Sequence, residues 1–199
     1  MKKIIFWLLI LVACWSIYNR TGQVQLGPGV MAPEAPQQTS ISTPVSHRVN
    51  KYEITELAQF EIKAKVLAKK DYQFDRGADI SPTDLALGWG SMSDERVLEN
   101  IKISQSGRFY HWRVDAFPIP RREIETHSAN MHLIPANDFV EKAIGKIRQG
   151  DIVRITGSLV NVTSNNGDWR WSSSLTRDDT GNGACELIWV KNLSIVTPP

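Results

Sequence analysis

The chain has 199 residues, of which 23 are basic and 21 acidic, so its net charge of +2 is close to balance. Proteins that bind nucleic acid usually carry a concentrated basic face. Here the densest basic stretch, residues 63–70, is flanked by Glu61 and Asp71. We therefore expect a solvated strand face at this stretch and no nucleic-acid partner. Two cysteines, Cys14 and Cys185, are too few for a disulfide framework.

The N-terminus carries an uncharged, apolar run from Ile4 to Tyr18, preceded by Lys2 and Lys3. As a helix this run is about 22 Å long, against a hydrocarbon core of about 30 Å, and snorkelling lysines with interfacial aromatic rings make up part of the difference. The basic residues before the run favour an N-terminus inside the cytoplasm. We predict a membrane anchor over residues 1–20, with a single pass through the bacterial inner membrane and the rest of the chain in the periplasm.

Other interpretations of the same run remain open. Leu11-Val12-Ala13-Cys14 resembles the bacterial lipobox, which implies lipidation of Cys14 and a lipid anchor in place of a transmembrane helix. The stretch departs from that family because Trp15 to Tyr18 continue the apolar run after the cysteine. A cleaved secretory signal is a third interpretation, although no clear small-x-small cleavage site is present.

Residues 21–50 are rich in glycine, proline, glutamine, serine and threonine and show no apolar periodicity. Such a segment buries too little apolar surface to offset its ordering entropy. We predict a disordered linker with a reach of about 30 Å. It is followed by a single extracytoplasmic globular domain over residues 51–197, which is an ordinary domain length.

The first half of this domain mixes strand and helix signals. Residues 60–66 alternate apolar and polar side chains, which predicts a half-buried strand. Ser81-Pro82-Thr83-Asp84 is typical of a helix start, so we predict a helix over 81–87 and a second one from Ser93 to Ile101. Residues 109–114 read as a strand, and the two prolines that follow end any pairing.

The second half reads as one helix and three strands. Asn137 is a predicted cap for a helix with apolar residues at helical spacing up to Ile147. Strands are expected over 152–162, 169–175 and 185–196, with a hairpin turn at 165–168. The fold class is therefore α+β, with about three helices and a small curved β-sheet or partly open barrel.

Ten residues carry a resemblance to a known fold. Gly150-Asp151-Ile152-Val153-Arg154-Ile155-Thr156-Gly157-Ser158-Leu159 is similar to a strand common in OB-fold barrels, where a glycine lets a long strand coil between two parts of the barrel. The resemblance implies an OB-like strand in the C-terminal half and a small curved β-barrel, and the pattern is not specific to OB folds.

A weaker resemblance covers more of the domain. Residues 74–77, 84–90 and 127–132 resemble segments of bacterial membrane-anchored proteins with no assigned activity. This resemblance implies a location and no chemistry.

The segment Arg121 to Pro135 is the best candidate for a ligand or partner site, because it is long, polar and bounded by prolines, and loops held by a scaffold often carry function. Its donors and acceptors are Arg121, Arg122, His127, Ser128, Asn130 and His132. The alternative is a structural loop whose polar groups satisfy backbone. Five tryptophans lie in the domain, and one or two of them on a sheet face are suited to stack a ligand.

No catalytic, cofactor or metal motif is evident. The five-residue separation of His127 and His132 is neither the helical nor the strand spacing of a metal pair. We therefore expect a non-enzymatic binding or assembly module of the bacterial envelope, with no cofactor and with an envelope protein as partner. The alternative is an envelope hydrolase or metal-dependent enzyme that uses the His127/His132 segment.

Overall fold

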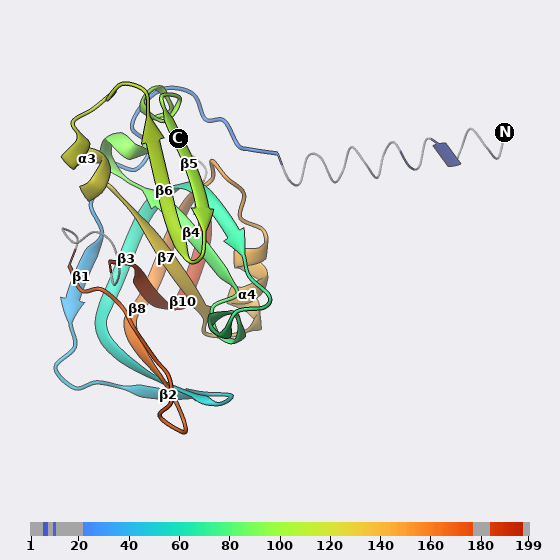
Figure 1. Ribbon diagram of the computed structural model, residues 1–199, viewed down its shortest axis with the longest axis vertical. Helices are drawn as coiled ribbons and strands as arrows, with labels where there is room; N and C mark the ends of the chain where they lie inside the picture. The colour runs from blue at the N-terminus through green and yellow to red at the C-terminus, as the bar shows by residue number, and fades with distance from the viewer. Residues whose placement is uncertain (1–5, 8–9, 11–21, 177–183, 197–199) are drawn as a thin grey trace.

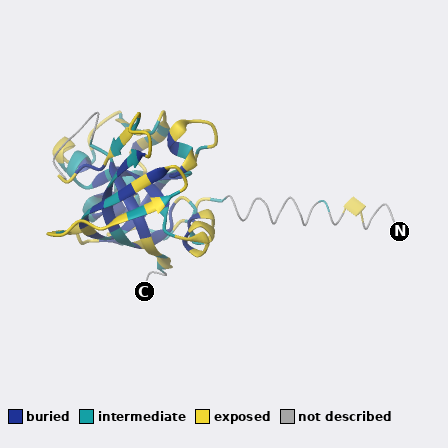
Figure 2. Ribbon diagram, turned by 90° about the horizontal axis from the view of Figure 1, so that it is seen from below, coloured by how far each residue is buried: buried dark blue, intermediate teal, exposed yellow. Residues whose placement is uncertain are grey.

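The computed structural model describes residues 6–7, 10, 22–176 and 184–196. The fold is α+β, with a mostly β-sheet core, and three α-helices lie within residues 22–196 as far as these are described. Figure 1 shows the sheet wrapped around the core, with the helices at its periphery. In Figure 2 the buried residues lie in the strands and the exposed ones mainly in loops and helices.

Five strands close into a ring. They are β3 (Tyr52–Asp71), β4 (Thr83–Gly88), β7 (Ser128–Pro135), β10 (Glu186–Val196) and β8 (Ile152–Ser164), in that order around the ring, and β8 pairs back onto β3. All neighbours are antiparallel except β7 and β10, which run parallel. The ring is uneven, because β3 has 20 residues and β4 has six. The strands β1 (Gln37–Ser40), β2 (Ser46–Val49) and β9 (Arg170–Ser172) add to its edges.

The sequence pattern accounts for most of the ring. β3 alternates buried and exposed side chains along much of its length, as the predicted strand at 60–66 does, and its inward residues pack with those of β8 and β10 in one apolar cluster. Gly157 in β8 is needed for close approach: a Cβ there would lie 2.1 Å from the carbonyl oxygen of Trp189. The glycine therefore lets β10 come close enough to complete the ring.

Helix α4 (Asp138–Gly145) connects β7 to β8 and confirms the predicted helix. The Asn137 side chain accepts hydrogen bonds from the backbone N–H groups of Phe139 and Val140, which is the expected N-cap. Val140 and Ile144 pack into the main apolar cluster, and Phe139 stays 81% exposed.

The predicted helix over 81–87 is wrong. Residues 83–87 instead lie in β4, which is fully buried between β3 and β7. Ser81 and Pro82 end the preceding loop, and Asp84, expected to favour a helix start, instead points from the strand to distant partners described below. The second helix is present but short, as α2 (Glu95–Leu98) after a 3-10 turn, η2 (Gly90–Ser93).

The predicted disorder of residues 21–50 is wrong for much of that segment. Strands β1 and β2 both pair with β3. Before them, a strap over residues 22–32 lies on the ring: the Glu95 carboxylate accepts hydrogen bonds from the N–H groups of Leu26 and Gly27, and Ser93 Oγ accepts those of Met31 and Ala32. Glu95 itself pairs with Lys65, which is 2% exposed. The strap is therefore ordered by its contacts with folded parts of the chain, which its own composition does not predict.

Among the described residues, no helix combines the length and the apolar character needed to cross a membrane. Most of residues 1–20, where the anchor is predicted, and Cys14 with them, lie outside the described residues. The membrane anchor therefore stays a prediction.

Strand β2 is held by a buried carboxylate. Glu56, on β3, is 4% exposed and contacts His47 Nε2 at 2.6 Å, Ser158 Oγ at 2.5 Å and Lys191 Nζ at 2.7 Å. The His47 ring also stacks on Trp189, with 5.3 Å between ring centres. Burial alone raises the pKa of Glu56, but the bonds from Lys191, Ser158 and His47 outweigh it and lower the pKa to about 2.

We expect Glu56→Gln to reduce the free energy of unfolding by about 2–3 kcal/mol at pH 7. Because the folded-state pKa is lowered, the charged form stabilises the fold above about pH 4.5, and this contribution is lost as the pH falls towards 2. Urea denaturation at pH 7, 4 and 3 should show that the difference in free energy of unfolding between variant and wild type becomes smaller as the pH falls. Glu61→Gln, in an exposed pair with Arg154, is the control and should change little. A difference that stays constant over this pH range would contradict the assignment.

Candidate functional site

A hairpin lies over the outer face of β4 and β7. It consists of β5 (Ile101–Ser106) and β6 (Phe109–Val114), which pair only with each other among the described residues. Gln105 Nε2 donates to Asn130 Oδ1 at 2.7 Å, and the hydroxyls of Tyr110 and Ser128 are in contact at 2.5 Å. Figure 1 shows the hairpin in front of these strands, with its tip near the middle of the molecule. The tip carries Arg108, in a left-handed backbone conformation with φ of +70°.

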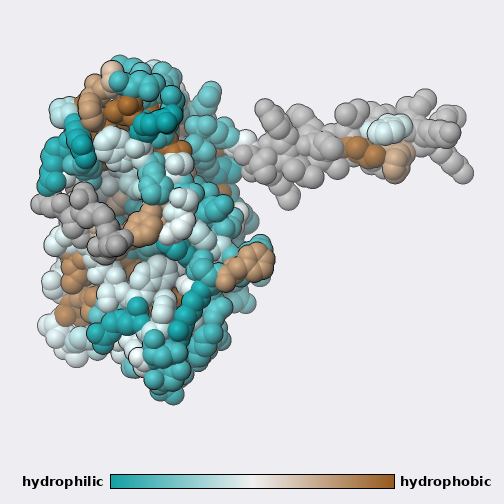
Figure 3. Space-filling model, in the orientation of Figure 1, coloured by the Kyte–Doolittle hydropathy of each residue, from teal (hydrophilic) through white to brown (hydrophobic). Residues whose placement is uncertain are grey.

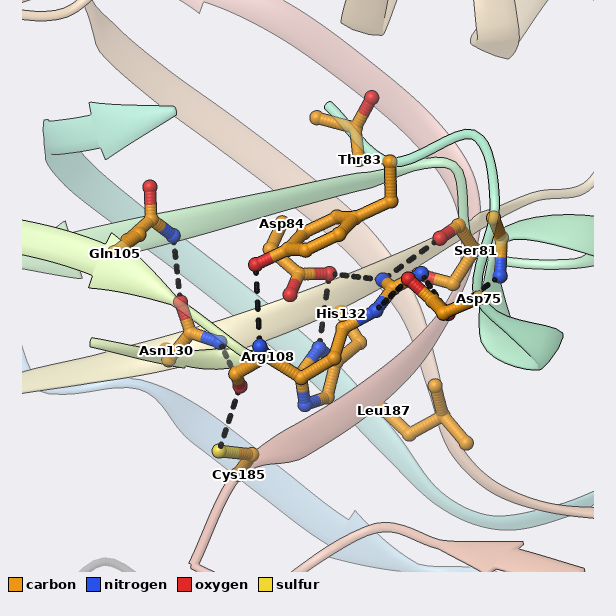
Figure 4. A network of polar contacts seen from close by, with 12 residues as sticks. Asp75, Ser81, Thr83, Asp84, Gln105, Arg108, Asn130, His132, Cys185 and Leu187 are labelled. Carbon is orange, nitrogen blue, oxygen red and sulfur yellow. Dashed lines mark hydrogen bonds and ion pairs between the residues drawn. The ribbon is translucent and has the colours of Figure 1, made fainter. Parts of the chain in front are cut away.

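Arg108 fixes the hairpin tip to the ring (Figure 4). Its guanidinium donates to Asp84 Oδ1 at 2.8 Å, to the Ser81 carbonyl at 2.9 Å, and to both carboxylate oxygens of Asp75. The ring of Tyr72 lies 3.8 Å from the guanidinium carbon. Burial of Tyr72, with the nearby Asp84 carboxylate, raises the pKa of its phenol. One side chain thus joins the hairpin, the β3–β4 loop and strand β4.

Asp84 is the fully buried acid of this network, with no exposed surface. Its Oδ1 also lies 2.9 Å from His132 Nδ1, although the angle is outside that of a hydrogen bond, and its Oδ2 has no hydrogen-bond partner. His132, 2% exposed on β7, lies against the Trp171 ring with 4.5 Å between ring centres. The buried acid is therefore compensated mainly by Arg108.

A cleft of about 430 Å³ opens beside this network. It lies where the β3–β4 loop, the hairpin tip and the β8–β10 segment meet, and its lining includes Trp169, Trp171, Phe109, Arg170, His132 and Cys185. Trp171 packs closely on the backbone at Gly77, because a Cβ there would lie 2.9 Å from the indole ring. Trp169 and Trp171 are both half-buried and meet edge to face at 5.8 Å. The cleft therefore presents aromatic surface among polar groups.

Most cations at and beside the cleft are matched by acids, and Arg170, an exposed residue of the cleft lining, is the exception among the described residues. In the cleft lining, Arg108 pairs with Asp75 and Asp84. Beside the cleft, Arg76 pairs with Asp168 and Lys51 with Asp79. The Arg76 pair lowers the pKa of Asp168 and raises that of Arg76, through their mutual hydrogen bond. The cleft is thus polar without a concentrated positive charge.

The segment predicted as a site loop, Arg121 to Pro135, has a different structure. It forms helix α3 (Arg121–Thr126) and the buried strand β7. Arg121 and Arg122 are exposed on α3, where Arg121 pairs with Glu125 at 2.8 Å. His127 ends this helix and packs against Gly90, and the buried Ser128 Oγ donates to the Ile124 carbonyl. These four residues lie away from the cleft lining.

The remaining two predicted residues lie under the hairpin. Asn130 donates to the Arg108 carbonyl at 3.0 Å, so its amide holds the hairpin tip from below. Of the six predicted residues, only His132 lines the cleft. His127 and His132 are about 16 Å apart along an extended chain, and within the described residues no three His, Cys, Asp or Glu side chains group as metal ligands do.

Sequence reasoning missed most of the cleft. Trp169 and Trp171 are among the tryptophans expected to stack a ligand or to lie in the core, but Arg108, Asp75 and Phe109 carried no signal. A glycine followed by an arginine in a hairpin turn gives no indication that the arginine will meet a buried acid 24 residues away.

Comparisons with protein families, with curated proteins and with solved structures found no match to this chain.

We expect Arg108→Ala to reduce the free energy of unfolding by about 3 kcal/mol at pH 7, because it leaves the Asp84 carboxylate buried without its main partner. Adding Asp84→Asn should recover part of that loss, since the unpaired charge is then gone. Arg76→Ala removes an exposed pair and should cost less than about 1 kcal/mol. Urea denaturation of the three variants and the wild type measures these differences. Equal losses for Arg108→Ala and the double variant would contradict this account of the network.

Proposed function

We propose that this protein is a membrane-anchored binding module of the bacterial envelope, in which an OB-like barrel holds a neutral oligosaccharide in the cleft at Trp169 and Trp171. The observation that carries the proposal is the pair of half-buried indole rings between the two loops that OB folds use for binding.

The strand order supports an OB-like barrel. Numbered in chain order, the ring strands β3, β4, β7, β8 and β10 run 1-2-3-5-4 around the ring, which is a five-stranded Greek-key arrangement. The sequence resemblance of residues 150–159 to an OB strand falls on β8, the fourth of these strands. OB folds bind oligonucleotides and oligosaccharides on the face of strands 2 and 3 and with the loops 1–2 and 4–5. The cleft lies at those two loops.

The lining suits a sugar. The face of an indole ring is electron-rich and apolar, so it packs against the C–H groups of a pyranose ring, while polar groups at the edges meet its hydroxyls. The hairpin covers much of the face of β4 and β7, which leaves the cleft at its tip as the accessible part of the binding region. Figure 3 shows a mostly hydrophilic surface on the face that carries the hairpin, which favours a polar ligand there over a large apolar partner.

The charges favour a neutral ligand over a nucleic acid. Binding of nucleic acid depends on lysine and arginine side chains that neutralise phosphates. Here Arg108, Arg76 and Lys51 are already paired with carboxylates, which leaves Arg170 as the one cation of the cleft lining without an acid partner among the described residues. A phosphate would have to compete with these acids for the cations, whereas a sugar hydroxyl does not.

The proposed location follows from the apolar N-terminal run, and the strap adds a constraint. The first strap contact, from the Val24 N–H to the Gln149 carbonyl, comes four residues after Arg20. If the chain is anchored, its barrel is then held next to the membrane surface. The cleft reaches the envelope glycan only if the anchor places the barrel on the periplasmic side of the membrane.

A second candidate function, a hydrolase, is favoured by one observation: His132 lines the cleft with its Nδ1 2.9 Å from Asp84 Oδ1, which places a candidate general base beside an acid. The burial of His132 under Trp171 argues against it, because attacking water has little access to the ring. Incubation with the bound glycan separates the two candidates: release of shorter products that stops in His132→Gln would support the hydrolase.

The test of the proposed function uses the full chain in detergent micelles. We expect tryptophan fluorescence to change on titration with at least one series of cello-, chito- or malto-oligosaccharides, and Trp171→Ala to weaken that binding about tenfold or more, because it removes a stacking surface. Trp112→Ala is the matched control: this half-buried tryptophan lies on the hairpin, outside the cleft lining, and meets Phe117 in the loop that follows β6. Circular dichroism checks that both variants fold. No response to any of the three series, or tighter binding of a thymidine 15-mer than of every glycan, would contradict the proposal.

A further inference from the structure

A second hollow adjoins the cleft. It has a volume of about 680 Å³ and is lined by Phe74, Arg76, Asp79, Asn165 and Asn166, among others. Asp75 lines both hollows, and both are bounded by the β3–β4 loop and the β8–β10 segment. The two hollows are therefore neighbouring parts of one edge of the ring.

Flat side chains lie on both sides of the boundary between the two hollows. Arg76 lines the second hollow while its guanidinium carbon lies 5.5 Å from the ring centre of Trp169, which lines the cleft. Arg76 also pairs with Asp168, at the turn that leads into β9. A surface of flat groups thus runs from Trp171 through Trp169 to Arg76.

Phe74 is the exceptional residue of the second hollow. It is 97% exposed, so its ring contributes almost nothing to packing within the chain. A single exposed apolar side chain is common on proteins. This one, however, lines a hollow whose other lining side chains are all polar, namely amides, charged groups and one hydroxyl, next to an aromatic cleft. An aromatic ring with free faces among amide donors and acceptors repeats the pattern of the cleft itself.

We propose that the hollow at Phe74 is a second subsite of the same groove, and that the ligand is a linear oligosaccharide that spans both hollows. This inference rests on the proposed function. Pockets of about 300–1,000 Å³ hold drug-sized ligands, so the two hollows together exceed the size of one sugar ring. The ion pairs along the boundary make it polar and close to neutral, which suits the hydroxyls of a chain that crosses it.

Two subsites on one groove give affinity that depends on chain length. A short oligosaccharide fills the cleft alone, and a longer one adds contacts at Phe74 without a second loss of translational freedom. The gain with length should therefore depend on Phe74, while the binding of the shortest ligands should not.

In the experiment, the full chain in detergent micelles is titrated with cello-, chito- and malto-oligosaccharides of two to six units, and calorimetry measures the affinity for each. We expect affinity in the bound series to rise about tenfold between the shortest and longest members. Phe74→Ala should abolish that rise and leave the affinity for the disaccharide unchanged. Phe139→Ala is the matched control, because Phe139 is also an exposed phenylalanine, 81% exposed, but lies on α4 outside both linings.

The outcomes separate the two proposals. Binding that is lost in Trp171→Ala but does not increase with length, or that increases equally in Phe74→Ala, would overturn the second subsite and leave the proposed function standing. Absence of binding at every length would overturn both. A length-dependent gain that Phe139→Ala removes and Phe74→Ala does not would also overturn the subsite.

Discussion

The burial of Asp84 is the constraint on which the rest of the site depends. A carboxylate with no exposed surface costs several kcal/mol unless it is paired and hydrogen-bonded. On this chain the main partner is Arg108, which reaches Asp84 only if the β5–β6 hairpin folds down over β4 and β7. The same arginine holds the β3–β4 loop through Asp75. The position of the hairpin, the shape of the loop and the mouth of the cleft therefore depend on this buried charge and its partner, alongside the Gln105 and Tyr110 contacts that also hold the hairpin.

The same physical logic explains the N-terminal segment. Glu95 is partly buried and pairs with the buried Lys65, and its remaining acceptor capacity is used by backbone N–H groups of the strap. Burial alone raises the pKa of Glu95, but the hydrogen bonds from Lys65 and from the strap outweigh this effect and lower the pKa. A segment too polar to form a core of its own is thus ordered by charged groups of the ring. This changes the expected architecture: what reads as a spacer is in large part a strap and two edge strands, so the folded part of the chain begins close to the end of the predicted anchor.

Much of the fold could be predicted from the sequence, because local pattern and packing agree there. The alternation in β3, the β-branched run of β8 and the capped stripe of α4 are each decided by neighbours in sequence, and the structure confirms all three. Prediction failed where contacts between residues far apart in the sequence determine the local structure. Ser81-Pro82-Thr83-Asp84 has the residues of a helix start, but β4 fills the gap between β3 and β7, and Asp84 takes Arg108 as its partner. The polar residues of β7 look like a site loop only until the hairpin that covers them is known. The cleft combines three segments far apart in the chain. Composition therefore indicated its tryptophans without indicating that the three segments meet around them.

The central claim is that the loops around Trp169 and Trp171 form the binding groove of an OB-like barrel. Hydrogen exchange, followed by mass spectrometry on the full chain with and without a saturating hexasaccharide of the bound series, tests it most directly. The account predicts slower exchange in residues 72–80, around Gly107 and Arg108, and in 165–172, with little change in α3. Protection concentrated in α3 and the adjoining turn, with none in the two loops, would contradict it.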